Sequence, residues 1–371
     1  MVASGPMSSA LLRTPLHDRH AALGAKFGGF AGWDMPLEYT TVRDEHRSVR
    51  TRCGVFDVSH MGQITVAGDG ARAYLDEVLT NDIDKLEPGE GQYTLVCHED
   101  GGVIDDLIVY ELLDHYMIIS NASNVAPVFD WVAAHAPEGV TVTDASARYA
   151  MLALQGPTWD QAIRPLVKGS EIFELPYFGI TQMAVAGVPS LVARTGYTGE
   201  PGVEIMCPSH RATDAWDALM AGPDAPAPAG LAARDTLRME MGYPLYGQEL
   251  SLTRTPIEAG LKWACDLEGG FVGADVMRRQ VADGTPERLC IFTLDEPGIP
   301  RTGCPVHVGD DVVGEVTSGT LSPTLGIGIG MAYVRSDLAT LGTTLQIDIR
   351  GKRKAATTGK RPLVDTSPKK D

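Results

Sequence analysis

The last third of the sequence is a series of short apolar runs separated by glycine and proline, and this pattern restricts the fold more than any other feature. The runs are Leu289–Leu294, Val312–Val316, Ile327–Val334 and Thr344–Ile349. Runs of this length between turn signals are typical of β-strands. Their succession predicts a small β-barrel or sandwich of roughly eighty residues, which we place at 285–365. A break near Gly269–Pro286 separates it from the rest of the chain.

The preceding residues mix helical and strand signals. Thr41 and Asp44 form the capping pattern of a helix that runs to about Arg52. Asp69 is expected to cap another helix, and apolar residues at helical spacing predict three more, at 156–167, 211–220 and 230–241. With 41 glycines and 24 prolines among 371 residues, short strands joined by turns are favoured over long helices. The fold class is therefore predicted as α+β.

Composition excludes several classes of protein. The 31 basic and 48 acidic residues leave a net charge of −17, which repels a phosphate backbone, so we expect no nucleic-acid partner. No uncharged apolar run is long enough to span a membrane, and the start of the chain lacks the pattern of a signal peptide, so we expect no membrane partner and a cytoplasmic location. The six cysteines are too scattered for a metal site and are expected to be reduced core residues.

Two adjacent acids make Glu99–Tyr110 the most informative segment. An Asp-Gly-Gly turn signal at 100–102 is followed by a strand in which Asp105 and Asp106 point to opposite faces, each among aliphatic residues. Burying an ionised carboxylate costs several kcal/mol unless it is paired or faces a polar pocket. At least one of the two therefore faces a binding site or a buried partner. The alternative is that Asp105 bonds the backbone near the turn and Asp106 pairs with an arginine.

A third acid, Glu204, lies in apolar sequence after the glycine-rich turn at 196–202. A carboxylate has two acceptor oxygens, which suit a ligand with adjacent N–H donors such as an aminopyrimidine or a pterin edge. A salt bridge inside the fold explains the same pattern equally well. Glu204 is therefore a candidate for ligand binding, with that alternative open.

Arg234 and Arg238 lie four residues apart on the expected helix at 230–241. They share a face, where like charges repel unless an anion lies between them. A carboxylate of a ligand would supply that anion. The alternative is local pairing with Asp235 or Glu240 on an exposed face.

Two further expectations concern the ends of the chain and one histidine. The segments Met1–Ser9 and Gly351–Asp371 are polar, small or like-charged, so burial is not expected to order them. His60 is interpreted as a structural residue and not as a catalytic base.

A series of short motifs extends over nearly the whole chain. They are Thr14-Pro15-Leu16, Phe30-Ala31-Gly32-Trp33, Phe56-Asp57-Val58-Ser59-His60-Met61, Gly101-Gly102-x-x-Asp105-Asp106-Leu107, Leu154-Gln155-Gly156-Pro157, Gly196-Tyr197-Thr198-Gly199-Glu200, Gly230-Leu231-Ala232-Ala233-Arg234-Asp235, and Thr317-Ser318-Gly319 with Ser322-Pro323. In this order and spacing the chain resembles the folate-dependent aminomethyltransferases, the T-protein family of the glycine cleavage system. The resemblance implies a three-part folate-binding fold with a central cavity and a C-terminal β-barrel. In that fold, residues 11–270 form two interleaved subdomains, one near 50–145.

The resemblance also implies an activity. The aminomethyl group on the lipoyl arm of the H-protein gives its methylene to tetrahydrofolate, and ammonia and the dihydrolipoyl H-protein are released. Asp106 matches the catalytic aspartate of the family, and Glu204 matches the acceptor for the pterin edge. The folate would also contact Tyr93, Tyr110, Tyr197 and Arg234. Neither a metal nor a flavin is implied.

Two other functions compete with this one. The folate half of a sarcosine- or dimethylglycine-oxidising enzyme is disfavoured, because the chain has no N-terminal dinucleotide fingerprint. A non-catalytic folate-binding accessory protein would carry a cysteine just before Tyr246-Gly247-Gln248-Glu249, where Pro244 and Leu245 stand here, and would lack the paired aspartates. The chain departs from the family in one respect, because Leu363 follows Pro362 where relatives place an aromatic residue.

Overall fold

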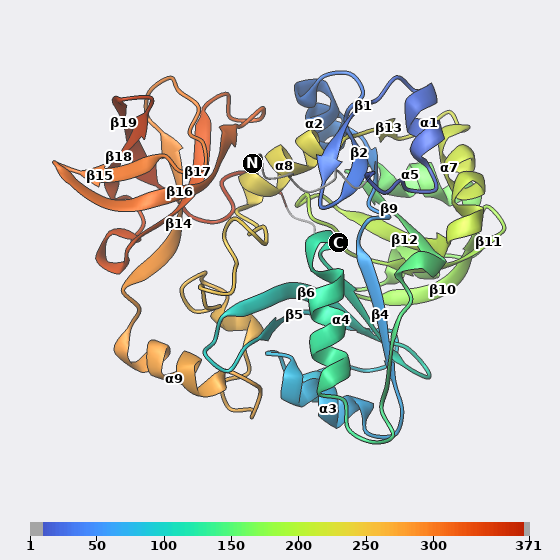
Figure 1. Ribbon diagram of the computed structural model, residues 1–371. Helices are drawn as coiled ribbons and strands as arrows, with labels where there is room; N and C mark the ends of the chain where they lie inside the picture. The colour runs from blue at the N-terminus through green and yellow to red at the C-terminus, as the bar shows by residue number, and fades with distance from the viewer. Residues whose placement is uncertain (1–9, 367–371) are drawn as a thin grey trace, which may run out of the picture.

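The computed structural model describes residues 10–366 and divides them into three lobes arranged around a centre (Figure 1). Each lobe has its own sheet and its own hydrophobic core. The α+β class and the three-part arrangement expected from the sequence are confirmed. The expectation for Met1–Ser9 lies outside the described residues.

The first lobe contains a six-stranded sheet in the order β10-β11-β12-β9-β3-β13. All of its neighbouring strands are antiparallel except β13 and β3, which are parallel. A hairpin of β1 and β2 and the helices α1, α2 and α5 to α8 accompany this sheet (Figure 1). The strands are β1 (Lys26–Phe30), β2 (Trp33–Glu38), β3 (Gly54–Asp57), β9 (Tyr149–Gln155), β10 (Ile180–Val185), β11 (Val188–Ala193), β12 (Gly202–Pro208) and β13 (Ala227–Pro228). The helices are α1 (His17–Ala22), α2 (Val42–Thr51), α5 (Trp159–Ile163), α6 (Glu171–Glu174), α7 (Ala212–Met220) and α8 (Leu231–Met241).

The second lobe is built from residues that lie between β3 and β9 in the chain. Its five-stranded sheet has the order β5-β6-β7-β4-β8. The apolar residues of α3 and α4 pack with those of the sheet in one core cluster, so these helices cover one of its faces. The elements are β4 (Gly62–Ala67), α3 (Ala71–Val78), β5 (Gly91–Cys97), β6 (Val103–Glu111), β7 (Tyr116–Ser120), α4 (Val125–Ala134) and β8 (Thr141–Asp144).

The third lobe is a closed barrel in the order β14-β17-β16-β15-β18-β19, in which β19 pairs with β14 and completes the ring. The expected C-terminal β-barrel is confirmed. Helix α9 (Ala274–Asp283) precedes it in the chain. The strands are β14 (Glu287–Leu294), β15 (Pro305–Val308), β16 (Asp311–Leu321), β17 (Gly328–Arg335), β18 (Thr344–Ile349) and β19 (Lys352–Thr358).

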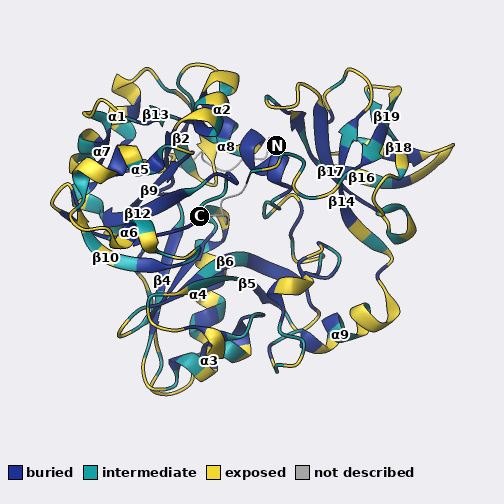
Figure 2. Cartoon of the chain, turned by 180° about the vertical axis from the view of Figure 1, so that it is seen from behind, coloured by how far each residue is buried: buried dark blue, intermediate teal, exposed yellow. Residues whose placement is uncertain are grey.

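Most of the helices predicted from local sequence patterns are present in the structure. The Thr41 hydroxyl accepts the backbone N–H of Asp44 at 3.1 Å, so this residue caps α2 as expected. Helix α3 differs, because Gly70 and not Asp69 precedes its first residue, and Ala73 is exposed on the outer face. Figure 2 shows the general pattern, in which the central strands are buried and the outer helix faces are exposed.

The expectation that burial does not order the C-terminal tail is wrong for residues 351–366. Strand β19 pairs with both β14 and β18. Beyond it, the backbone N–H of Leu363 donates to the carbonyl of Glu240 at 2.8 Å, and its side chain packs on a core cluster. The prediction from charge failed because the barrel closes only when this last strand is added.

A buried polar cluster joins α2, α8 and the loop after β16. The Glu240 carboxylate lies 2.8 Å from Arg50 Nη2 and 3.3 Å from His46 Nε2, and it also accepts hydrogen bonds from Ser322 and Thr324. Burial alone would raise the pKa of Glu240. The hydrogen bonds from His46 and Ser322 and the charge of Arg50 outweigh burial and lower the pKa to about 2. The cluster therefore holds the barrel to the first lobe with an ionised carboxylate.

Replacing Glu240 with glutamine is expected to destabilise the folded chain by about 3 kcal/mol, because Arg50 then loses a buried partner. The lowered pKa means that this stabilisation is present above the pKa of the unfolded carboxyl and is lost as the pH falls toward 2. Denaturant unfolding of the wild type and E240Q at pH 7 measures the difference. Equal midpoints would show that the cluster does not stabilise the junction.

Candidate active site

A cavity of about 1290 Å³ opens where the three lobes meet. The first sheet contributes Glu204 from β12, the second sheet contributes Asp106 from β6, and Arg234 projects from α8. The barrel adds Ser318 from β16. A space of this size at the junction of lobes, with a few polar groups among apolar walls, is typical of a site for an organic ligand.

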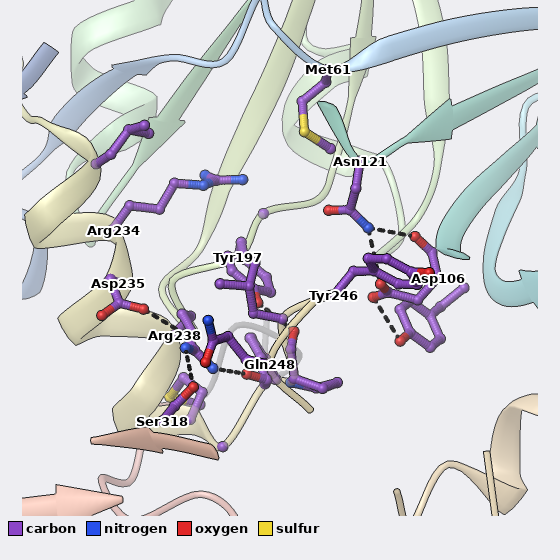
Figure 3. Close-up of a pocket in the computed structure, with 18 of the residues that line it drawn as sticks. Met61, Asp106, Asn121, Tyr197, Arg234, Asp235, Arg238, Tyr246, Gln248 and Ser318 are labelled. Carbon is purple, nitrogen blue, oxygen red and sulfur yellow. Dashed lines mark hydrogen bonds and ion pairs between the residues drawn. The ribbon is translucent and has the colours of Figure 1, made fainter. Parts of the chain in front are cut away.

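Asp106 lines this cavity and both of its carboxylate oxygens are held. Asn121 Nδ2 donates to Oδ1 at 2.9 Å, and the Tyr93 hydroxyl donates to Oδ2 at 2.9 Å (Figure 3). Burial raises the pKa of Asp106 to about 6, although these two hydrogen bonds favour the ionised form. Among the described residues no basic group forms an ion pair with Asp106, so the alternative of an arginine partner is wrong.

Asp105 points to the opposite face of β6 and is completely buried. Its oxygens accept the backbone N–H of Asn121 at 2.9 Å and the side-chain amide of Asn124 at 2.7 Å. Burial and the neighbouring charge of Asp106 raise its pKa. The alternative that Asp105 bonds the backbone near the turn is therefore wrong, because its partners follow β7.

Glu204 and Arg234 each present unpartnered polar atoms at the cavity. Burial raises the pKa of Glu204, and the guanidinium of Arg234 opposes this. Among the described residues no donor bonds the Glu204 carboxylate, and Arg234 Nη1 is buried without a hydrogen-bond partner. The Arg234 guanidinium carbon lies 5.1 Å from the centre of the Tyr197 ring. An acceptor and a donor thus remain open for a ligand that has both kinds of group.

The three predicted tyrosines lie in different places. Tyr93 lines the cavity and stacks on Trp263 with 5.2 Å between ring centres. Tyr197 also lines it and stacks on Tyr243 at 5.8 Å. Tyr110 is outside the lining and is 1% exposed in a core cluster. The expectation that the folate contacts Tyr110 needs correction, because Tyr110 packs in a core cluster with residues of the first lobe, among them Ile180 and Met206.

Arg238 is neutralised inside the fold. Its Nε lies 2.9 Å from Asp235 Oδ1, and its Nη1 lies 3.0 Å from Glu249 Oε2. The local pairing with Asp235 is confirmed, whereas the expected exposed face is wrong because the Arg238 side chain is buried. Glu240 pairs with Arg50 instead.

Several residues that line the cavity were not predicted from the sequence. Asn121 follows β7 directly, and a polar residue at the end of a buried strand is a usable signal. Trp263 has no such signal, and Arg361 was assigned to the tail. His60 also lines the cavity, and burial lowers its pKa to about 4, so it is neutral at pH 7.

Two kinds of feature are absent from residues 10–366. No group of three or more His, Cys, Asp or Glu side chains is arranged to hold a metal ion. No helix in the same range is long and apolar enough to cross a membrane.

Fold and site together define a class of protein: a three-lobed chain with a cavity between its lobes that is large enough for an organic ligand and has a carboxylate held by two donors on its wall. Residues 16–269 match the GCVT N-terminal domain, and residues 287–365 match the glycine cleavage T-protein C-terminal barrel domain. The chain belongs to the glycine cleavage T-protein family, the aminomethyltransferases, as its motifs indicated.

Individual relatives are similar to this chain along almost its full length. The aminomethyltransferase of Geobacillus kaustophilus is 45% identical over 348 residues, which cover 92% of this chain and 96% of the relative. That of Bacillus cytotoxicus is 42% identical, with 96% and 99% covered. The crystal structure of glycine cleavage system aminomethyltransferase T from Bartonella henselae superposes with a TM-score of 0.90 at 31% identity, over 96% of this chain and 99% of that one.

Proposed function

We infer that this chain transfers the methylene of an aminomethyl-lipoyl H-protein to tetrahydrofolate, giving 5,10-methylenetetrahydrofolate, ammonia and dihydrolipoyl H-protein. It is a tetrahydrofolate-dependent aminomethyltransferase of the glycine cleavage system. The observation that carries the proposal is a carboxylate, Asp106, held by two donors on the wall of a cavity that also contains the unpartnered Glu204 and Arg234.

The open polar atoms suit a reduced pterin. The two oxygens of Glu204 accept from adjacent N–H groups of the pterin edge, and Arg234 donates from its unpaired nitrogen. Tyr93 and Tyr197 supply aromatic faces within the same cavity. These residues bind and orient the acceptor.

Asp106 acts on the reacting centre. Because Tyr93 and Asn121 fix both of its oxygens, its anion does not reorient when positive charge develops on the carbon being transferred. It also aligns the folate for attack by nitrogen 5. Enclosure by the three lobes strengthens this interaction, since charges interact more strongly where water is excluded.

The partners, cofactors and cellular location that we propose are those expected from the sequence. The partners are the lipoylated H-protein and tetrahydrofolate, with no nucleic acid and no membrane, and neither metal nor flavin takes part. The protein works in the cytoplasm.

Ammonia release tests the reaction. The purified chain is mixed with tetrahydrofolate and H-protein loaded with the aminomethyl-lipoyl group, and ammonia and methylenetetrahydrofolate are measured together. We expect equal amounts of both. A non-catalytic accessory protein would bind folate and release no ammonia, and that outcome would refute the proposal.

A further inference from the structure

The side-chain amide of Asn121 faces more acceptors than it has hydrogens. Its Nδ2 lies 2.9 Å from Asp105 Oδ1, 2.9 Å from Asp106 Oδ1 and 3.0 Å from the Asp106 carbonyl oxygen. An amide nitrogen carries two hydrogens, and a carbonyl oxygen in its place would face three acceptors with none. The network therefore fixes which end of the amide points toward the two aspartates.

The other end of the amide, Oδ1, is consequently directed away from the aspartates. Figure 3 shows Asn121 with its nitrogen toward Asp106 and its oxygen toward the side where Arg234 lies. Among the described residues no donor bonds this oxygen, and Asn121 lines the cavity. The cavity wall thus presents a fixed hydrogen-bond acceptor next to the carboxylate of Asp106.

Asp105 helps to secure this orientation together with Asp106. It bonds both the backbone N–H of Asn121, at 2.9 Å, and the side-chain amide. It is completely buried and is not part of the cavity lining, so it influences a ligand only through its neighbours. Every partner that bonds it, Asn124 included, is a donor, so the Asp105 carboxyl oxygens act as acceptors in this network.

We propose that Asp105 is a positioning residue that keeps the Asn121 amide oxygen turned to the cavity as an acceptor for an N–H of a reduced pterin, so that the site selects tetrahydrofolate over oxidised folate. This inference rests on the proposed function in taking a folate as the ligand. Nitrogens 5 and 8 carry hydrogens in the tetrahydropterin, whereas in the oxidised ring both have only lone pairs. The Asn121 amide oxygen would repel the lone pair of an oxidised ring nitrogen and would remain without a hydrogen bond. Binding sites that are built to bond an N–H strongly disfavour ligands that lack it.

Anaerobic titrations of the full chain with tetrahydrofolate and with folic acid test the proposal. We expect the wild type to bind tetrahydrofolate at least roughly 100-fold more tightly. Asp105→Asn weakens the hold on the Asn121 amide, because an amide that also donates replaces one of the three acceptors and only the two Asp106 oxygens remain. The preference is then expected to fall about tenfold or more.

The matched control is Glu111→Gln. Glu111 is also a buried carboxylate on β6, but it bonds Arg72 at 2.6 Å and lies outside the cavity lining. We expect this variant to keep the full preference. A purely structural role for Asp105 would lower the melting temperature without changing the ratio of the two affinities.

An unchanged ratio in Asp105→Asn, or a wild type without preference, would overturn the proposal. If Asp105→Asn does not fold, Asn121→Ala decides, because removing the amide must itself lower the ratio at least tenfold. The proposed transfer reaction is judged separately by ammonia release. A chain that prefers tetrahydrofolate and releases no ammonia refutes the reaction alone, and a chain that releases ammonia without the preference refutes only the role of Asp105.

Discussion

Asp106→Asn is expected to lower turnover by about a hundredfold or more while the Kd for tetrahydrofolate stays within about tenfold. The asparagine fills the same space, so the cavity keeps its shape. It removes the preorganised negative charge that we propose stabilises the transition state, and the loss of one such group costs about this much in rate. Single-turnover ammonia release and equilibrium folate binding separate the two effects. Unchanged turnover would refute the role of Asp106.

The pH dependence gives a second check on the same residue. Burial raises the pKa of Asp106 to about 6, and the role that we propose for it requires the ionised form. We therefore expect kcat/KM to be level above pH 7 and to fall as the pH drops below about 6, approaching tenfold per pH unit. The Asp106→Asn variant should lack this fall, and a variant that retained it would assign the titration to another group.

Glu204→Gln is expected to weaken tetrahydrofolate binding about 100-fold and, in the same variant, to stabilise the folded chain. The first effect follows because an amide offers one acceptor oxygen where the pterin edge needs two, and places its own N–H groups against donors. The second follows because the carboxylate is buried with no hydrogen-bond donor among the described residues, so burial raises its pKa and its ionised form destabilises the native state at pH 7. We expect a gain of about 1–3 kcal/mol.

Glu200→Gln is the matched control for this prediction. Glu200 precedes β12 and is also buried, but it lies 2.9 Å from Arg50 Nη1. Because Glu200 lies outside the cavity lining, its replacement should leave folate binding unchanged. Burial raises the pKa of Glu200 but the Arg50 charge opposes this, so its replacement should stabilise the chain less than that of Glu204. Thermal melting and folate titration measure both quantities. A loss of stability in Glu204→Gln would show that its carboxylate is paired in solution.

The sequence was informative where a local rule applied. The turn at 100–102 and the alternation along 103–110 placed Asp105 and Asp106 on opposite faces of one strand, and the structure has that strand as β6, paired with β5 across the turn. Gly101 has φ +83°, and a Cβ on Gly102 would lie 2.0 Å from the carbonyl oxygen of Leu252. Both features require glycine there, but only the left-handed backbone at Gly101 is a local property that a turn signal predicts.

The errors arose where partners are distant in the sequence. Tyr110 shares the face of Asp106, but only the packing of the first lobe against the second sheet shows that this end of the strand is covered. The tail was judged by its charge, whereas its strand is required to close a ring that begins at Glu287. The position of Asn121 at the end of a buried strand was a usable signal, but its contact with Asp105 and Asp106 depends on the pairing of β6 with β7.

The sequence by itself determined the strand pattern of the barrel, the main helices and, through the spacing of its motifs, the family. These follow from local backbone preferences and side-chain periodicity, which each segment carries alone. Only the tertiary structure decided which of the two adjacent acids faces the cavity, and that Glu204 and Arg234 face it without partners. Such choices depend on which distant groups are buried beside each side chain, because the free energy of a charge is set by its surroundings.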